Sequence, residues 1–190
     1  MPTVAVSRKR ACAQLVACRS APQAMPGPRS MTHTLSAQLL DHPLLEHLDA
    51  HYRGMPPVAA MQVSIAGYDG ERLRLRAPLS HNINDKGCAF GGSLSSLMTL
   101  AAWGLVTLHV QEAGMEADVY VADSTVRYLA PLFGDLEAEA HAAPEADWAG
   151  FATTLAERGK ARTELVARVT LPDGRDAATF RARFVAFRRG

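Results

Sequence analysis

Residues 84–103 read NDKGCAFGGSLSSLMTLAAW, and this stretch decides the fold. A turn-like cluster with three glycines runs directly into a segment that carries no Asp, Glu, Lys or Arg from Cys88 to Gln111. Uncharged residues over that length predict a helix at 89–112, roughly 36 Å long at about 1.5 Å per residue. A helix without a charged face must be buried on most sides, so the rest of the chain has to cover it.

The start of this helix is also a candidate ligand site. The first backbone N–H groups of a helix have no intrahelical partner and carry partial positive charge. Gly91 and Gly92 would let a carbonyl group approach those amides, which would stabilise an oxyanion forming on it. The same glycines would equally serve a tight loop before a packed helix, and the residue pattern alone leaves both interpretations open.

The segments on either side have the periodicity of regular secondary structure. Leucines at spacings of three and four predict a helix over 35–52, which Gly54 and the following proline pair end. Residues 145–158 are expected to form a short helix or an ordered loop. Alternating apolar residues predict strands at 71–77, 134–142, 160–171 and 175–188. Residues 58–68, which a turn-forming Asp-Gly pair follows, and residues 118–129, which a proline ends, are also predicted to be strands.

This order of elements predicts an α+β fold. Strands linked as hairpins, without regular alternation of strand and helix, indicate an antiparallel sheet. One long apolar helix needs a sheet that curls around it. The expected architecture is therefore the hotdog fold, a central helix wrapped by a curved antiparallel sheet of about five or six strands and preceded by an N-terminal helix.

The composition of the chain changes at residue 30. Of the 190 residues, 1–30 contain five Lys or Arg and no acid, whereas 31–190 contain fifteen Lys or Arg and nineteen Asp or Glu. Residues 1–30 are expected to be a disordered extension, or to precede a true start at Met31. A targeting peptide and a lipoprotein signal ending at Cys18 are the alternatives. Residues 31–190 are expected to form the single domain.

Composition also bounds the partners. The mildly acidic body gives no sign of a nucleic-acid-binding surface. Cys12, Cys18 and Cys88 cannot form a disulfide framework, so a cytoplasmic location is expected. The apolar stretch 88–111 is long enough to span a bilayer, but its glycines, serines and threonines favour a helix buried in a soluble core. No membrane partner is expected.

Two segments resemble a known family. The loop NDKGCAFGG (84–92) resembles the Asn-x-x-Gly-Thr-x-His-Gly-Gly motif of hotdog-fold acyl-CoA thioesterases. The segment VADSTVRYLAP (121–131) resembles their next strand, which ends in an aromatic–Leu–x–Pro corner. The resemblance covers residues 35–188 and is closest to the thioesterase-like domain at the C-terminus of YiiD-type acetyltransferases. It implies sites between two subunits, and hence a homodimer or a dimer of dimers.

The resemblance is incomplete at positions that carry chemistry. Phe90 replaces a histidine, Thr99 lies where many relatives carry a helix carboxylate, and Val121 replaces a serine found in some. Hydrolysis still requires a group that accepts a proton from water. Asp123 is two residues beyond Val121, so strict alternation places both on one face of the sheet and makes Asp123 the expected base. An ion pair between Asp123 and an arginine is the alternative.

Other side chains near the motif are expected to contact the substrate. The hydroxyl residues of the helix share nearly one face and would line an acyl or water channel, unless they bond back to the preceding turn. A turn-forming carboxylate and an aromatic residue from the loop complete the set. The predicted substrate-binding residues are Asp85, Phe90, Ser95, Ser96 and Thr99.

These features predict a thioesterase acting on a thioester of coenzyme A or acyl carrier protein. The predicted catalytic residues are Asn84, Gly91, Gly92 and Asp123. The glycine amides would hold the carbonyl oxygen, Asn84 would position water, and Asp123 would deprotonate it. Alternatively, Asn84 only shapes an Asx turn. No metal or redox cofactor is implied, and coenzyme A enters only as part of the substrate.

Two other functions remain open. A hotdog hydratase or dehydratase would carry Asp-x4-His at this loop, but Asp85 is followed at that spacing by Phe90. A non-catalytic domain that binds acyl-CoA or a protein partner would also lack the helix carboxylate. Cys88 has no evident paired base that would make it a nucleophile. His47 and His51 lack the carboxylate-rich neighbours of a metal site.

Overall fold

The computed structural model describes residues 42–189. The helices are α2 (Pro43–Gly54), α3 (Pro56–Ala60), α4 (Gly91–Glu112) and α5 (Trp148–Arg158), with a 3-10 turn η1 (Leu79–His81). The strands are β1 (Ser64–Tyr68), β2 (Arg72–Ala77), β3 (Ala117–Tyr128), β4 (Leu136–Ala142), β5 (Lys160–Thr170) and β6 (Asp176–Arg188). Two strands before the long helix and four after it agree with the sequence prediction.

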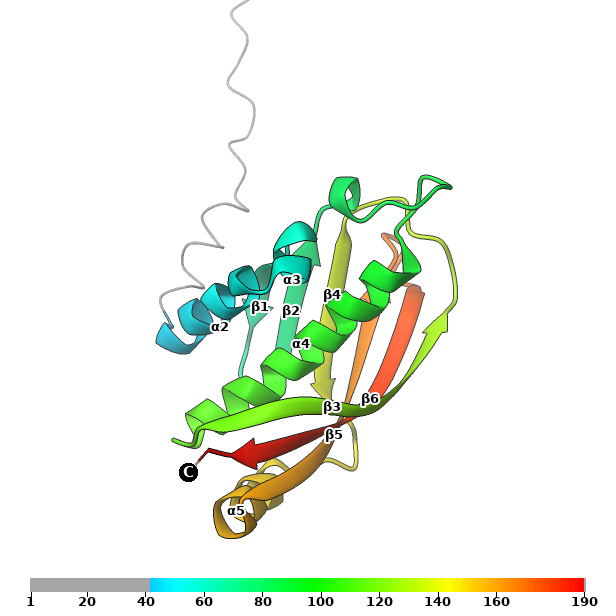
Figure 1. Cartoon of the computed structure of the whole chain (residues 1–190). Coiled ribbons are helices and arrows are strands. Elements are labelled where there is room, and N and C mark those ends of the chain that lie inside the picture. Colours follow the sequence, from blue (N-terminus) through cyan, green and yellow to red (C-terminus); the bar gives the residue numbers. More distant parts are fainter. Residues whose placement is uncertain (1–41, 190) are drawn as a thin grey trace, which may run out of the picture. The chain divides into compact units, whose positions relative to one another are not determined.

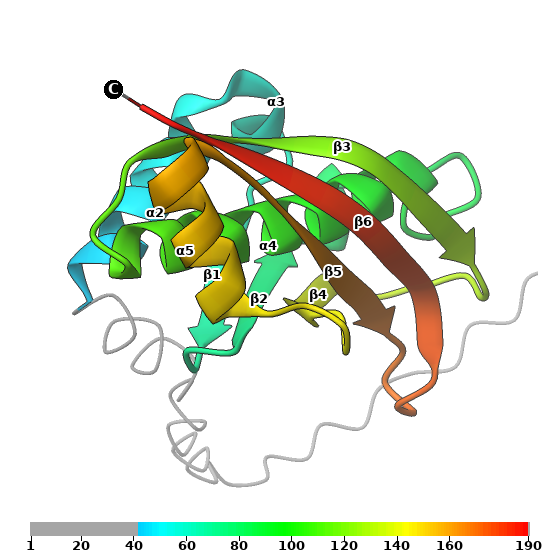
Figure 2. The same ribbon diagram turned by 90° about the horizontal axis from the view of Figure 1, so that it is seen from below.

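One antiparallel sheet contains all the strands of the described part, in the order β1-β2-β4-β5-β6-β3. The sheet curls around α4, which lies along its concave face (Figure 1, Figure 2). This arrangement confirms the predicted hotdog fold, with six strands. β1 and β3 are the two edge strands, and β3 follows α4 directly in the chain.

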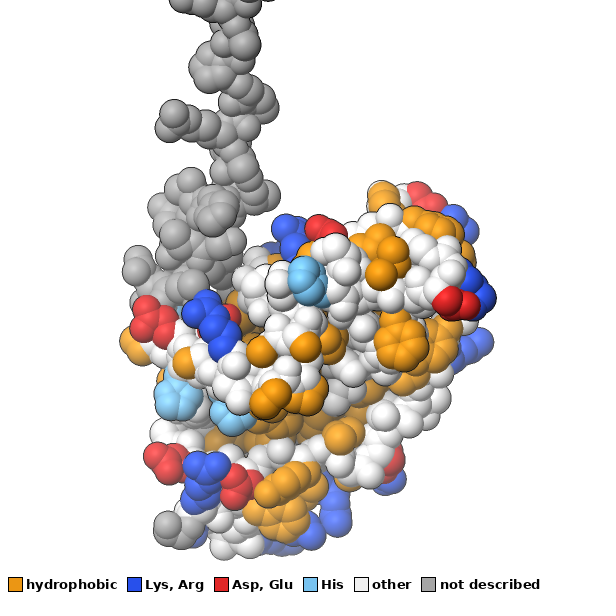
Figure 3. Space-filling model, turned by 45° about the horizontal axis from the view of Figure 1, so that its top comes forward, with side chains coloured by type: hydrophobic (Ala, Val, Ile, Leu, Met, Phe, Trp, Pro, Cys, Tyr) orange, Lys and Arg blue, Asp and Glu red, His pale blue; other side chains and the backbone are white. Residues whose placement is uncertain are grey.

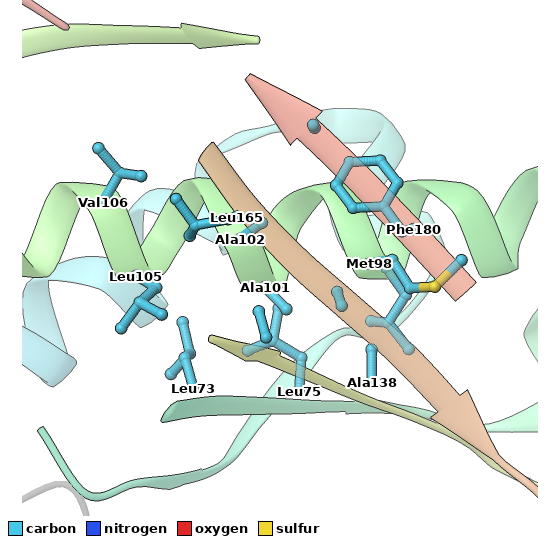
Figure 4. Close-up of a cluster of buried hydrophobic side chains, with 14 of the residues drawn as sticks. Leu73, Leu75, Met98, Ala101, Ala102, Leu105, Val106, Ala138, Leu165 and Phe180 are labelled. Carbon is cyan, nitrogen blue, oxygen red and sulfur yellow. The ribbon is translucent and has the colours of Figure 1, made fainter. Parts of the chain in front are cut away.

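The core forms between α4 and the residues that each strand turns toward it. Met98 and Leu105 of α4 are fully buried, and Leu75 of β2 and Phe180 of β6 belong to the same cluster (Figure 4). Burial of each such side chain contributes about 1.5–3 kcal/mol. By length and composition α4 could cross a membrane, but most of its apolar stretch is buried inside this fold. The prediction of a buried core helix is confirmed.

One predicted boundary differs from the structure. Residues 58–68 are predicted to be a strand, but Pro56–Ala60 forms the short helix α3 and only Ser64–Tyr68 joins the sheet. Proline has no backbone N–H, but an N–H in the first turn of a helix has no partner within the helix. Proline therefore fits well at the first position, and the proline pair starts a helix here. α2 also begins with proline, at Pro43. The predicted helical residues before 42, and the predicted boundary at residue 30, lie outside the described residues.

A notch at Gly104 lets α2 approach α4 closely. Tyr52 of α2 is buried, and its hydroxyl donates a hydrogen bond to the Leu100 carbonyl oxygen at 2.9 Å. Burial raises the pKa of the Tyr52 phenol well above its usual range, because the charged form would lose its hydration. A Cβ atom at Gly104 would overlap this hydroxyl and lie 2.8 Å from a methyl group of Leu73.

We expect Gly104→Ala to lower the free energy of unfolding, although alanine is the better helix former by about 1 kcal/mol. The overlap with Tyr52 should outweigh that gain, for a net loss of about 1–3 kcal/mol measured by urea denaturation. Gly54→Ala is the matched control, because nothing lies within 4 Å of the added Cβ atom. Equal stability of the two variants would show that the notch is not needed.

Candidate functional site

Asn84 shapes the loop that leads into α4. Its Oδ1 atom accepts the backbone N–H of Lys86 at 2.8 Å and that of Cys88 at 3.2 Å. Its Nδ2 atom lies 3.2 Å from the Cys88 sulfur, and Gly87 adopts a positive φ of 78° in the same turn. Both lone pairs of Oδ1 are thus used within the loop. The structure supports the Asx-turn interpretation, in which Asn84 positions the loop rather than orienting water through that oxygen.

α4 begins without a side-chain cap. The N-cap residue is Phe90, and the first turn contains no acidic residue. The first bond of the helix runs from the Leu94 N–H to the Phe90 carbonyl oxygen, at 3.0 Å. The amides of Gly91, Gly92 and Ser93 make no hydrogen bond to any other described residue. These three donors carry the partial positive charge of the helix end, so they can hold a carbonyl oxygen on which negative charge develops.

Two aromatic rings flank the glycine pair. A Cβ atom at Gly92 would overlap the ring of Phe90, which is itself largely exposed. A Cβ atom at Gly91 would lie 3.4 Å from the ring of Tyr128, an ordinary contact. The Tyr128 hydroxyl donates a hydrogen bond to the Gly91 carbonyl oxygen at 3.1 Å. Gly92 therefore makes room for Phe90, and Tyr128 ties the end of β3 to the start of α4.

The hydroxyl residues in the first turns of α4 differ in what they bind. Ser95 donates to the Gly92 carbonyl oxygen at 2.9 Å, and Thr99 donates to the Ser95 carbonyl oxygen at 2.8 Å. Ser95 and Thr99 thus bond back to the preceding turn, which is the alternative to lining an acyl or water channel. Ser96 is exposed, and its hydroxyl forms no hydrogen bond with the described part of the chain. Of the three, Ser96 is the hydroxyl available to a ligand.

A β-bulge at Ala122 changes the face on which Asp123 lies. Val121 pairs with Phe184 and Asp123 with Arg183, with a register shift between them. Phe184 is buried in the core, so Val121 faces α4, whereas Asp123 faces the outer side of the sheet. There the Asp123 carboxylate accepts a hydrogen bond from Arg183 Nε at 2.7 Å. The predicted shared face of Val121 and Asp123 is wrong, and the alternative ion pair forms instead.

Beyond the bulge, other residues of β3 face the helix. Ser124 and Tyr128 pair with buried residues of β6, Ala182 and Ala178, and so lie on the inner side of the sheet. Neither residue is among the site residues that the sequence predicts. Tyr128 could have been found from the aromatic corner of the motif, but no glycine or proline marks the bulge that brings Ser124 inward.

Asp85 lies in solvent at the tip of the loop. Its carboxylate pairs with the ammonium group of Lys86 at 2.9 Å, and both side chains are exposed. Asn84 forms the turn in its place. Within residues 42–189, no three His, Cys, Asp or Glu side chains come together as a metal-binding group.

Five large apolar side chains around the helix start are exposed. Their exposed fractions are 51–68%, and we call them the helix-start patch: Ile83, Phe90, Tyr128, Leu129 and Phe133. The Ala89 N–H donates to the Leu132 carbonyl oxygen at 2.8 Å, which holds the corner after β3 against the loop. Hydrophobic side chains form a band across the face that carries α4 (Figure 3). Exposed apolar patches of this kind are candidate contact surfaces for a ligand or another protein.

Known proteins match the part of the chain that contains the candidate site. A family profile described as "Putative thioesterase (yiiD_Cterm)" matches residues 46–188. A protein of unknown function from Chlorobaculum tepidum is 32% identical, with 77% of this chain and 95% of that chain covered and a TM-score of 0.72. A putative thioesterase from Shewanella oneidensis is 31% identical, with 76% and 97% covered and a TM-score of 0.68. The match includes the loop, α4 and β3.

Because Asp123 faces away from α4, we expect Asp123→Asn to keep kcat for thioester hydrolysis within about threefold of wild type. Removal of a general base typically costs about 10²–10⁴-fold. Thiol release from acyl-CoA substrates measures the rate, and Asp85→Asn serves as a second exposed carboxylate. A hundredfold loss confined to Asp123→Asn would restore Asp123 as the base.

Proposed function

Because this chain belongs to the family described as "Putative thioesterase (yiiD_Cterm)", we propose that it hydrolyses an acyl thioester of coenzyme A or of acyl carrier protein. Family and fold support thioesterase-type chemistry. The observation that carries the proposal is the uncapped start of α4, where the amides of Gly91, Gly92 and Ser93 bond to no other described residue. Hydrolysis of a thioester creates the oxyanion that suits such donors.

The proposed reaction is direct attack by water. The water oxygen bonds to the carbonyl carbon, and the resulting oxyanion accepts hydrogen bonds from the free amides at the helix start, those of Gly91, Gly92 and Ser93. The C–S bond then breaks, and the proton lost by the water passes to the departing sulfur, so the products are a carboxylic acid and a free thiol. A thiol has a pKa of about 8.5, so a thiolate is a good leaving group. Asp123, on the outer face, has no part in this scheme.

We further propose that two copies complete the site by pairing through β3. β3 is a 12-residue edge strand, and Tyr120 and Val121 expose about half of their surface on it. An exposed, partly apolar edge readily pairs with another strand. Antiparallel pairing about a two-fold axis would join the sheets and bring a second copy toward the helix-start patch. The proposed assembly is a homodimer, or a dimer of such dimers, acting in the cytoplasm without a metal or redox cofactor.

A non-catalytic acyl-CoA-binding domain is the second candidate. It is favoured by Thr99, whose hydroxyl bonds to the preceding turn where many relatives carry a helix carboxylate. The outward position of Asp123 removes the other predicted base from the helix side. Binding of a thioester without turnover would identify this function.

Gly92→Val should reduce kcat/KM at least about tenfold, which corresponds to about 1.4 kcal/mol of transition-state stabilisation. The added methyl groups would cover the amides, but they would also displace the Phe90 ring. The double variant Phe90→Ala/Gly92→Val relieves that overlap and should remain slow. Thiol release from a panel of acyl-CoA thioesters measures both. Recovery of the rate in the double variant would assign the loss to Phe90 and remove the oxyanion role.

Wild-type protein should sediment as a dimer, and Val121→Glu should weaken association at least about tenfold by placing a charge beside the paired edges. Val166→Glu is the matched control, since Val166 is half-buried on β5, an interior strand. Analytical ultracentrifugation across a concentration series measures both. A monomeric wild type, or equal association of the two variants, would contradict pairing through β3.

A further inference from the structure

Arginines gather on the outer side of the sheet, the side that faces away from α4. Leu73, Ala140 and Ala167 are buried on the inner side, and their neighbours along each strand point outward. β5, β6 and β3 lie side by side here, with α4 behind them (Figure 2). The strand registers place outward residues of five strands in two neighbouring rows, which we call the arginine rows. From β2 to β3 they are Arg74, Glu139, Arg168, Thr179 and Arg127, and Arg72, His141, Val166, Arg181 and Thr125.

The arginine rows are basic, whereas the domain as a whole is acidic. The rows contain five arginines and one acid, a net charge of +4 with histidine neutral. Residues 31–190 contain fifteen Lys or Arg and nineteen Asp or Glu, a net charge of −4. Positive charge is therefore concentrated on one face, where it can attract and orient an anionic partner.

Most of this charge is not neutralised by neighbouring carboxylates. Arg74 and Arg127 form no ion pair within residues 42–189. Arg72 and Arg168 share the Glu139 carboxylate, at 3.1 and 3.2 Å. The fifth arginine pairs with two carboxylates of its own, from β5 and from the loop before α5. The other four arginines, all of them exposed, thus share one carboxylate.

The rows also enclose a hollow of about 460 Å³. Arg127, Arg168 and Arg181 line it, and Asp176 is the one acid among its lining residues. An arginine side chain can hold a carboxylate through two parallel hydrogen bonds. Three guanidinium groups around one hollow therefore suit a partner that presents several carboxylates close together.

The spread of the cations favours a protein partner over a small anion. Arg74 on β2 and Arg127 on β3 are four strand spacings apart, or about 19 Å. A phosphate group binds one or two arginines, whereas an acidic protein surface can contact a whole row. A second copy of this chain, if its own rows met these across a two-fold axis, would bring like charges together. The rows contain no Phe, Tyr or Trp on which a nucleic-acid base could stack.

The end of β3 connects the rows to the candidate site. Arg127 faces outward, and the next residue, Tyr128, faces inward and donates a hydrogen bond to the Gly91 carbonyl oxygen at 3.1 Å. A partner bound to the rows therefore lies on the opposite side of the strand that ends beside the helix start. A thioester on a flexible arm can pass around the end of β3 to the free amides, while its carrier stays outside.

We propose that the arginine rows dock an acidic carrier protein, which delivers its acyl thioester to the helix start. This inference rests on the proposed function and names the carrier-protein thioester, rather than the coenzyme A thioester, as the substrate that the chain recognises. The docking contact is electrostatic, so it speeds encounter and weakens as salt is added.

Charge reversal at Arg127 tests the docking surface. Because Arg127 has no ion-pair partner within residues 42–189, Arg127→Glu should keep the fold. With the decanoyl thioester of acyl carrier protein, kcat/KM should fall at least about tenfold, chiefly through a higher KM. With decanoyl-CoA, kcat/KM should stay within about twofold of wild type.

Arg158→Glu is the matched control for this variant. Arg158 is exposed on α5 and likewise has no ion-pair partner in the described part of the chain. Both substrates should therefore react with Arg158→Glu as they do with wild type. Equal losses in the two variants would overturn docking at the rows. An equal loss with the two substrates would assign Arg127 to the phosphates of coenzyme A and overturn the protein partner.

A second variant separates docking from pairing through β3. Arg168 lies on β5, an interior strand, so Arg168→Gln removes a charge from the rows and leaves the free edge unchanged. It should also lower kcat/KM for the carrier-protein substrate alone, by about threefold or more. The difference from wild type should shrink when sodium chloride is raised from about 50 to 500 mM, because salt screens exposed charges. A loss confined to Arg127→Glu would assign the effect to the β3 edge and overturn the rows.

A binding measurement separates this inference from the proposed function. Fluorophore-labelled holo acyl carrier protein should bind wild type and Arg158→Glu in an anisotropy titration, and binding to Arg127→Glu should be at least about tenfold weaker. If this pattern appears but neither thioester is hydrolysed, hydrolysis is refuted and the docking surface stands. If decanoyl-CoA is hydrolysed but the carrier protein does not bind, the docking surface is refuted. A single-stranded DNA oligomer that binds as tightly as the carrier protein would overturn the choice of partner.

Discussion

α4 carries no charged residue before its last position, and that one property constrains the rest of the chain. An apolar helix of this length cannot leave a face in water, so the sheet has to bend around it rather than lie flat against one side. Fully buried residues from α4 and from strands on both sides of the curl, such as Leu97, Leu75 and Leu165, show that the cover is shared. The curvature is thus a consequence of the sequence of one helix.

The sheet that curls around α4 has a free edge at β3. The strand order ends with β3, so the sheet stops beside α4 instead of closing over it. The inner side of β3 can then face the helix start, while its free edge can face a second copy. The Asp123–Arg183 pair lies on the outer surface, where exposed ion pairs contribute only about 0–1 kcal/mol. The bulge matters more, because it decides which side chains point inward.

Much of the fold could be predicted because it depends on periodicity. The uncharged stretch gives α4, and strict alternation gives β2, β4, β5 and β6 with bounds close to those observed. The site resists this reasoning because it departs from periodicity. A single inserted residue at Ala122 reverses the side on which Asp123 and Ser124 lie, and nothing in the local sequence marks the insertion.

The start of α4 also shows a competition between stability and ligand binding. A Ser, Thr, Asp or Asn at the N-cap would bond to an amide of the first turn and stabilise the helix by about 1 kcal/mol. Phe90 occupies that position instead and lies against Gly92, where any larger residue would collide with its ring. A capping oxygen would occupy the same donors that a substrate carbonyl needs. An uncapped start is less stable in the free protein, and it keeps the donors oriented and available to the ligand.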